Sequence, residues 1–379
     1  MTVRELIARL VAFETVSRDS NLALIDYVRS YLNDFGIQST LVPNDEGTKA
    51  NLYATIGPMV AGGVVLSGHT DVVPVDGQPW QTNPFVAVEH NGRLYGRGTC
   101  DMKSFCAIVL ALVPEMKRLK KPIHLALSYD EEVGCRGAPR MIRNLLESVP
   151  RPAVVIVGEP TAMQVVTAHK GIMALKTIVT GHEAHSSQTH RGVSAVMTGA
   201  RLINYLEEMA RDKQLSAMPN SGFEPGFTTI HVGVITGGTA VNIISRHCEF
   251  EWDIRNMPGD DPSVIVDHFN AYCRKTIEPP MWAIDPSTGI TTQILACAPA
   301  LRHEPAGEAV RLVQAITGTT AIHKVSYAAE GGQFQEAGLP TVLCGPGSID
   351  QAHKPNEFIT LEQVEAGTDF VRKLINRLS

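Results

Sequence analysis

Histidine and carboxylate residues in this sequence cluster after short apolar segments and, in one case, at the start of an apolar segment. The set consists of His69, Asp71, Asp101, Glu131, Glu132, Glu159 and His353. Imidazole nitrogens and carboxylate oxygens together form a ligand shell that suits zinc, cobalt or manganese. Five ligands of which one carboxylate is shared by two cations are typical of a two-metal site. The residue types therefore predict a centre that holds two divalent metal ions.

Predicted strands and a predicted helix place these residues. His69 and Asp71 follow an apolar strand at 64–66, and they are two positions apart, so that both side chains can share one side of an extended segment. The other residues follow strands predicted at 123–129, 154–157 and 341–344, and Asp101 opens a buried helix predicted over 102–119. Because the carboxyl ends of parallel strands open into one crevice, we expect these side chains to meet there.

Each residue of this set also has a structural explanation when it is taken alone. An acid after a strand is most often a helix cap, Glu131 and Glu132 could form a solvated turn, and His353 could be a surface histidine. The joint occurrence of five such parts at strand ends favours a metal site over five separate structural roles.

The alternation of helix and strand patterns predicts an α/β fold with a mostly parallel sheet flanked by helices. Beyond residue 172 the order of the predicted elements is β-α-β-β-α, which suggests an inserted α+β domain with a ferredoxin-like arrangement. The α/β pattern resumes after Pro279 and Pro280, and it ends with a helix at 361–378. We therefore predict a catalytic domain in two parts, 1–175 and 287–379, interrupted by a domain at 176–286.

Composition excludes several classes of partner. The chain has 379 residues with 33 basic and 39 acidic side chains, and a net charge of −6 argues against nucleic acid and against an anionic membrane surface. No apolar run reaches the roughly 18 residues of a membrane span, and the N-terminal segment lacks the features of a signal peptide. Seven scattered cysteines without a C-x-x-C pair fit a reducing cytoplasm.

Common catalytic motifs are absent from the sequence. It contains no G-x-S-x-G segment, no P-loop and no H-E-x-x-H segment. The Gly96-Arg97-Gly98 turn lacks the third glycine of a dinucleotide site. These absences argue against serine hydrolases, NTPases, zincins and dehydrogenases.

The order and spacing of the motifs resemble the M20 metallopeptidase family. The segments that carry the resemblance are SGHTDVVP (67–74), YGRGTCDMK (95–103), DEEVG (130–134), GEPT (158–161), GHEAHSS (181–187) and GPGSIDQAHKPNE (345–357). The last segment and HVGVITGGTAVN (231–242) look most like the acetylornithine deacetylases of this family. The resemblance implies a zinc-peptidase-like catalytic domain and a lid that also forms a homodimer.

The resemblance implies a role for each residue of the metal centre. His69 and Glu159 would hold one divalent ion, Zn²⁺ or Co²⁺, and Glu132 and His353 would hold the other. Asp101 would bridge the two ions.

The resemblance also assigns the catalytic residues beside the ions. Asp71 would orient the His69 imidazole, and Glu131 would be the general base. His185 would reach the active site of a partner subunit and contact the oxyanion. His182 is a competing candidate, but only His185 keeps the family's four-residue step from Gly181.

The same family implies a small acylamino acid as the substrate. Asn242 and Arg255 match the pair that grips the substrate carboxylate, for which a guanidinium offers a planar bidentate fork. Glu330 lies where members of the family differ, and it is our candidate for a contact with a distal ammonium group.

Three functions remain open at this point. The first is deacetylation of N2-acetylornithine, and the second is a related activity, either desuccinylation of succinyl-diaminopimelate or broad N-acyl-amino-acid hydrolysis. The third is a metal-binding scaffold without catalysis, which Glu131 argues against because a scaffold has no use for an acid that binds no metal. Metal-dependent turnover would distinguish the third from the others, and a panel of substrates would separate the first two.

Overall fold

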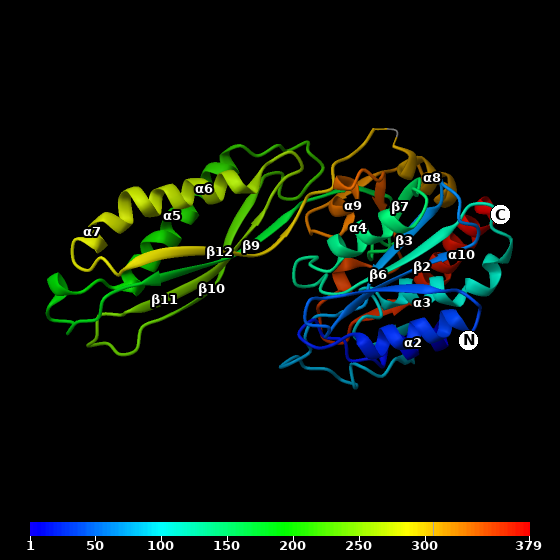
Figure 1. Cartoon of the computed structure of the whole chain (residues 1–379), viewed down its shortest axis with the longest axis horizontal. Coiled ribbons are helices and arrows are strands. Elements are labelled where there is room, and N and C mark those ends of the chain that lie inside the picture. The colour runs from blue at the N-terminus through cyan, green and yellow to red at the C-terminus, as the bar shows by residue number, and fades with distance from the viewer. Residues whose placement is uncertain (306) are drawn as a thin grey trace. The chain divides into compact units, whose positions relative to one another are not determined.

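The computed structural model describes residues 1–305 and 307–379 of the protein. The chain divides into two compact units (Figure 1). The first comprises residues 1–169, 301–324 and 329–379, and the second comprises residues 170–300 and 325–328. Among the residues described, no helix combines the length and the apolar character that crossing a membrane requires.

The first unit contains a mixed eight-stranded sheet with the strand order β1-β2-β6-β3-β7-β14-β8-β13. Its strands are β1 (Ser39–Pro43), β2 (Ala50–Ile56), β3 (Val64–His69), β6 (Ile123–Ser128), β7 (Val154–Val157), β8 (Val166–His169), β13 (His323–Val325) and β14 (Thr341–Leu343). The four central strands β6, β3, β7 and β14 run parallel to one another. Their carboxyl ends therefore lie at the same edge of the sheet.

Helices cover both faces of this sheet. They are α1 (Val3–Val11), α2 (Leu22–Asn33), α3 (Lys103–Ala111), α4 (Ala138–Ser148), α8 (Glu308–Thr317), α9 (Gly331–Glu336) and α10 (Leu361–Leu378). Helix α4 contacts α9 on one face of the sheet, whereas α3 contacts α1 and α10 on the other. This arrangement confirms the predicted α/β fold with a mostly parallel sheet between helices.

The main core lies on the α3 side of the sheet. Alternate strand residues enter it, such as Leu52, Leu66, Leu125 and Ile156. The residues between them, such as Ser67, point to the opposite face, where α9 packs against β7 and β14. All six residues of β3 are buried, and its first three, Val64, Val65 and Leu66, are apolar in succession, as expected of a strand covered on both faces.

A small third sheet joins distant parts of the first unit. It contains β4 (Val88–His90), β5 (Arg93–Tyr95) and β15 (Phe358–Thr360), all in antiparallel pairs. The pair β5–β15 aligns Tyr95 with Phe358. It therefore brings the segment before Asp101 next to the segment after His353.

The second unit is an antiparallel four-stranded sheet with helices. Its elements are β9 (Ile172–Thr180), α5 (Ala195–Leu215), β10 (Thr229–Gly237), β11 (His247–Arg255), α6 (Pro262–Tyr272), α7 (Glu278–Trp282) and β12 (Gly289–Ala298). The strand order is β10-β11-β9-β12, which is the ferredoxin-like order. Leu175, Phe250, Trp252 and Phe269 form part of its core.

Two boundaries differ from the sequence-based expectation. Residues 289–298 were grouped with the first unit, but β12 pairs with β9 along its whole length, from Gly289 with Thr180 to Ala298 with Ile172. The second unit therefore extends past residue 286. The helix expected over 102–119 ends with α3 at Ala111, and a 3₁₀ helix, Val113–Arg118, follows with Pro114 in its first turn, because a proline cannot donate the hydrogen bond that would continue α3.

Candidate metal centre and active site

His69 ends β3 with its side chain 1% exposed. Its Nδ1 lies 2.9 Å from the backbone carbonyl oxygen of Asp71, and its Nε2 lies 3.0 Å from Oδ1 of Asp101. A carbonyl oxygen only accepts, so Nδ1 carries the proton and donates. Nε2 is then the ring nitrogen that is available as a ligand for a cation.

Asp101 lies between the two histidines of the centre. While Oδ1 faces His69, Oδ2 lies 3.3 Å from Nε2 of His353, which in turn lies 2.9 Å from Oε2 of Glu132. Ligand atoms of His69, Asp101 and Glu132 all lie within 4.8 Å of one another. The geometry therefore allows one carboxylate, that of Asp101, to face two adjacent cation positions.

Glu159 follows β7 and is 4% exposed. Its Oε1 is buried and has no hydrogen-bond partner among the described residues. Burial and the nearby Asp101 carboxylate hold the pKa of Glu159 well above its usual range. A buried, unpaired carboxylate oxygen is costly unless a cation or a proton satisfies it.

The electrostatics of the cluster fit a pair of divalent cations. Burial and the Asp101 charge raise the pKa of Glu132 to about 7, and hydrogen bonds to Asp101 and Glu132 raise the pKa of His353 to about 10. Burial alone would raise the pKa of Asp101, but hydrogen bonds from His353 and His69 keep it below its usual range. The carboxylates repel one another, and cations bound there would relieve this repulsion. The donor set, the orphaned Glu159 oxygen and the shared Asp101 therefore fit the predicted metals.

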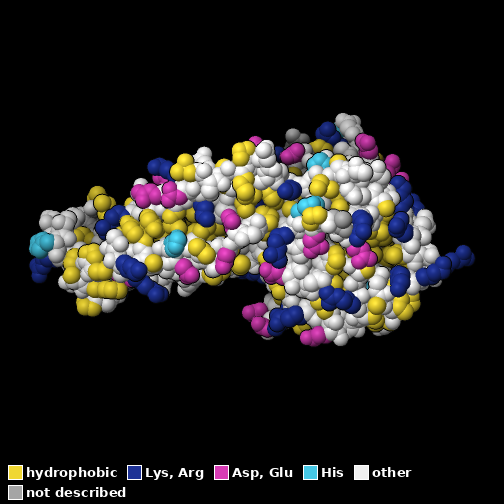
Figure 2. Space-filling model, turned by 90° about the horizontal axis from the view of Figure 1, so that it is seen from above, with side chains coloured by type: hydrophobic (Ala, Val, Ile, Leu, Met, Phe, Trp, Pro, Cys, Tyr) yellow, Lys and Arg dark blue, Asp and Glu magenta, His cyan; other side chains and the backbone are white. Residues whose placement is uncertain are grey.

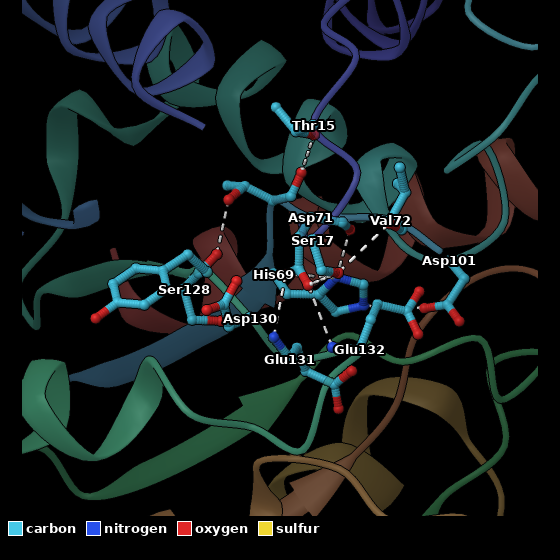
Figure 3. Close-up of polar contacts among 12 residues, drawn as sticks. Thr15, Ser17, His69, Asp71, Val72, Asp101, Ser128, Asp130, Glu131 and Glu132 are labelled. Carbon is cyan, nitrogen blue, oxygen red and sulfur yellow. Dashed lines mark hydrogen bonds and ion pairs between the residues drawn. The ribbon is translucent and has the colours of Figure 1, made fainter. Parts of the chain in front are cut away.

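Asp71 organises the site with two different groups. Its backbone carbonyl fixes the His69 ring, whereas its carboxylate oxygen Oδ1 is 3.7 Å from His69 Nδ1. The carboxylate accepts the backbone N–H groups of Glu131 and Glu132 at 3.1 and 3.2 Å and the Ser17 hydroxyl at 2.6 Å (Figure 3). The orientation of His69 predicted for Asp71 is thus made by its backbone, while its side chain holds the loop after β6.

Glu131 belongs to the same loop, and the Cys135 thiol donates to its Oε1 at 3.3 Å. Burial, followed by the charge of Glu159, holds the pKa of Glu131 well above its usual range. A raised pKa makes a carboxylate a stronger base, which favours a role in general acid–base catalysis.

Glu330 immediately precedes α9 and is 1% exposed. Its Oε2 accepts the Ser67 hydroxyl at 3.2 Å, and its Oε1 has no hydrogen-bond partner among the described residues. Ser67 is on β3, two positions before His69. Glu330 therefore lies against the strand that carries a metal ligand.

His185 and Asn242 lie on adjacent segments of the second unit. His185 forms an isolated antiparallel bridge with Ile243, and the N–H of Ser186 donates to the Asn242 carbonyl at 3.0 Å. The His185 side chain is exposed, and its Nδ1 lies 3.2 Å from the N–H of Ser187. Since that N–H can only donate, Nδ1 accepts and Nε2 carries the proton of the neutral ring. The competing His182 instead faces Asp285, with Nδ1 2.5 Å from Oδ2.

Arg255 lies at the other end of β11 from Asn242. Asn242 precedes β11, and Arg255 is the last residue of this nine-residue strand. At about 3.3 Å per residue, the two ends of β11 are about 26 Å apart. Arg255 Nε contacts Asp253 Oδ2 at 3.0 Å. Within one chain, the expected carboxylate-binding pair is therefore not brought together.

Sequence reasoning missed three residues that contact the site. They are Ser17, which donates to Asp71, and the ion-paired residues Arg97 and Glu357. Nothing in the local sequence marks Ser17. The short step from His353 to Glu357 within a loop that follows a parallel strand is a signal that could have drawn attention to Glu357.

An α/β unit whose parallel strands bring histidines and carboxylates to one edge, interrupted by an antiparallel α+β unit, is the arrangement of a metal-dependent hydrolase of the peptidase type. Residues 65–377 match the Peptidase family M20/M25/M40, and the chain belongs to this family. It is 32% identical to an acetylornithine deacetylase of Pasteurella multocida, covering 98% of this chain and 97% of the relative. It is 33% identical to an acetylornithine deacetylase of Proteus mirabilis, covering 99% and 96%.

Solved structures share this fold at lower sequence identity. An M20 family metallo-carboxypeptidase from Sulfolobus solfataricus superposes with a TM-score of 0.77 at 16% identity, covering 98% of both chains. A dinuclear metal-binding peptidase of the M20 family from Bacillus subtilis gives 0.64 at 12% identity, covering 99% of this chain and 97% of that one. The likeness extends over both units of the chain.

Proposed function

We propose that this protein hydrolyses N2-acetyl-L-ornithine to L-ornithine and acetate, a step of arginine biosynthesis. The observation that carries the proposal is the cluster of His69, Asp101 and Glu132, whose ligand atoms lie within 4.8 Å of one another. Relatives with the name acetylornithine deacetylase, 32–33% identical over nearly the full chain, support this choice of substrate.

Two ligand groups and one shared carboxylate form the proposed metal centre. His69 and Glu159 hold one position, Glu132 and His353 hold the other, and Asp101 serves both. Zn²⁺ or Co²⁺ bound there would polarise the amide carbonyl and lower the pKa of water.

Glu131 is the proposed general base. Its carboxylate takes a proton from the attacking water and passes it to the departing amine nitrogen when the C–N bond breaks. The N–H groups of Glu131 and Glu132 are both held by Asp71, so the base and a metal ligand keep a fixed relation.

Two chains complete the proposed substrate site. Asn242 and Arg255 lie at opposite ends of β11, so a carboxylate that contacts both needs Arg255 from one chain and Asn242 from another. Because His185 lies beside Asn242, the chain that supplies Asn242 to the site also supplies His185. The Nε2–H group of His185 then donates to the oxyanion that forms at the amide carbonyl.

The surface of the second unit supports a homodimer. Val234 and Ile235 on the edge strand β10 are 55% and 51% exposed, and Met197 on α5 is 67% exposed. Figure 2 shows hydrophobic side chains among charged ones on this unit. An apolar edge strand is a common surface for pairing with a second copy.

A location in the cytoplasm, where amino acids are made, belongs to the same proposal.

Broad N-acyl-amino-acid hydrolysis is the second candidate function. Glu330 is the residue we expected to distinguish ornithine by its ammonium group, but it is 1% exposed and hydrogen-bonded to Ser67. Glu330→Gln should therefore reduce kcat/KM for acetylornithine and for acetylmethionine alike. A loss confined to acetylornithine would restore Glu330 as the ammonium contact and favour the narrow specificity.

A panel of substrates tests the proposed function. Metal-loaded protein should have its highest kcat/KM with N2-acetylornithine, compared with acetylmethionine and succinyl-diaminopimelate. Arg255→Lys should lower kcat/KM for every acylamino acid, because lysine lacks the bidentate fork of the guanidinium. Arg246→Lys, an exposed change in the same unit, should leave kcat/KM unchanged. A strong preference for succinyl-diaminopimelate would overturn the assignment, and no turnover with either metal would leave only a binding role.

A further inference from the structure

A buried ion pair lies directly behind the candidate metal centre. Arg97 and Glu357 are each 1% exposed, and Nη1 of Arg97 lies 2.7 Å from Oε2 of Glu357. The pair exists because β5 and β15 align and the ladder continues through a hydrogen bond of 2.9 Å from Gly96 N to the Glu357 carbonyl. Neither residue is a ligand in the proposed centre.

The Glu357 carboxylate holds the loop that carries Asp101. Its Oε1 accepts the N–H groups of Cys100 and Asp101 at 2.8 and 3.1 Å, and its Oε2 accepts the N–H of Gly98 at 3.1 Å in addition to the Arg97 contact. A carboxylate has about four acceptor directions, and all four are used here. One side chain thereby fixes the backbone of the residue that faces both cation positions.

The Arg97 guanidinium holds the loop that carries His353. Its Nη1 donates to the Lys354 carbonyl at 3.3 Å, and its Nη2 donates to Oε1 of Gln78 at 2.6 Å. The amide nitrogen of Gln78 donates in turn to the His353 carbonyl at 3.0 Å. His353 has a φ of +64°, a left-handed conformation that is unfavourable for a non-glycine residue and requires support from its surroundings.

We propose that Arg97 and Glu357 are the positioning pair of the metal centre and set the separation between Asp101 and His353. Glu357 acts through the Asp101 backbone, and Arg97 acts through Gln78 and Lys354 on the His353 backbone. Asp101 and His353, which are distant in the sequence, are thus both anchored to the same buried ion pair. This inference rests on the proposed metal centre, but not on the substrate.

Glu357→Gln is the central variant of the test. The amide nitrogen of glutamine would face backbone N–H donors, so at least one contact to the Asp101 loop is lost. Glu278→Gln is the matched control, because Glu278 is 7% exposed and accepts the N–H of Ile290 at 2.8 Å in the second unit. Both changes remove a buried carboxylate that accepts backbone N–H groups, but only Glu357 adjoins the metal ligands.

The experiment titrates metal-free protein with Co²⁺ alone, in competition with a chelator, and records the visible absorption. We expect Glu357→Gln and Arg97→Lys to weaken Co²⁺ binding about 10–100-fold and to shift the absorption bands, as loss of an outer partner of metal ligands does. Glu278→Gln should keep the wild-type affinity and spectrum even if its melting temperature falls.

A second variant keeps the test decisive if Glu357→Gln does not fold. Gln78 is only half-buried, and Gln78→Ala removes the path from Arg97 to the His353 carbonyl that runs through the Gln78 side chain, while the contact from Arg97 to Lys354 remains. This variant should lower the affinity for one of the two Co²⁺ ions and leave the affinity for the other unchanged. Wild-type affinity and spectrum in Glu357→Gln, or in Gln78→Ala if the former cannot be prepared, would overturn the positioning role. Failure of the wild-type protein itself to bind Co²⁺ would instead remove the metal centre.

Discussion

The carboxylate of Asp71 accepts the backbone N–H of Glu131 at 3.1 Å, a contact that joins the loops after β3 and β6. Its other oxygen accepts the N–H of Glu132 at 3.2 Å and the hydroxyl of Ser17. The proposed base and a proposed metal ligand therefore share one anchor, and that anchor also orients His69 through its backbone carbonyl. A change at Asp71 should disturb proton transfer and metal binding together.

Asp71→Asn tests this anchor. The side-chain amide nitrogen of the asparagine would face a backbone N–H donor, so the N–H group of either Glu131 or Glu132 would lose its acceptor. We expect kcat/KM to fall about 10–100-fold and metal content to decrease. Asp76→Asn is the control, since Asp76 is exposed and pairs with Arg18 on the surface. Unchanged kinetics and metal content in Asp71→Asn would show that the anchor is dispensable.

Glu131→Gln should separate catalysis from metal binding. The variant keeps the shape of the side chain, and Glu131 is not a proposed ligand, so both metal ions should remain. Removing a general base should reduce kcat by about 10²–10⁴-fold. Metal analysis and steady-state kinetics check this, with the exposed Glu147→Gln as control. Near-normal turnover at full metal content would end the assignment of Glu131 as the base.

Asp101→Ala should reduce metal affinity at both positions, because its two oxygens face His69 and His353 separately. Glu159→Ala and His353→Ala should each remove mainly one ion. Metal stoichiometry of the purified variants distinguishes the two patterns. Two tightly bound ions in Asp101→Ala would refute the bridging role.

Mixed dimers test whether His185 acts on a partner chain. His185→Ala and Glu131→Gln should each be inactive alone, but a mixture of the two should regain activity. One of the two sites in a mixed dimer then contains native Glu131 from one chain and native His185 from the other. If subunit exchange is demonstrated by mass and activity still does not return, His185 does not act between chains.

His124 should make the stability of the first unit dependent on pH. Burial lowers its pKa to about 4, and its Nε2 has no hydrogen-bond partner among residues 1–305 and 307–379. In the unfolded chain the pKa is about 6.5, so between pH 6.5 and 4 the unfolded state binds more protons than the folded state. The free energy of unfolding should therefore fall by about 3 kcal/mol as the pH drops through this range.

Urea denaturation of metal-free protein at several pH values measures this effect. His124→Leu should lose less stability on acidification than the wild type, whatever its stability at pH 7. The exposed His268→Leu should behave like the wild type. Parallel pH profiles for the wild type and His124→Leu would contradict the lowered pKa.

The fold class and the family could be predicted from the sequence alone. Apolar strands followed by His69, Glu131 and Glu159 could be recognised locally, because strand patterns and the residues after them are encoded in a few consecutive positions. That these strand ends meet follows from parallel pairing, which the alternation of helices and strands predicts. The ferredoxin-like order of the second unit was predicted on the same basis, except that the edge strand β12 was not assigned to it.

The contacts that hold the site together could not be predicted from the sequence. The contacts of Asp71 with Ser17 and Glu131, and of Arg97 with Glu357, join residues separated by 54, 60 and 260 positions. The separation of Asn242 from Arg255 follows from the length of β11 and not from their spacing in the sequence. Such relations depend on which loops fold against one another. A single sequence specifies them through the energy of the whole fold and not through any local pattern.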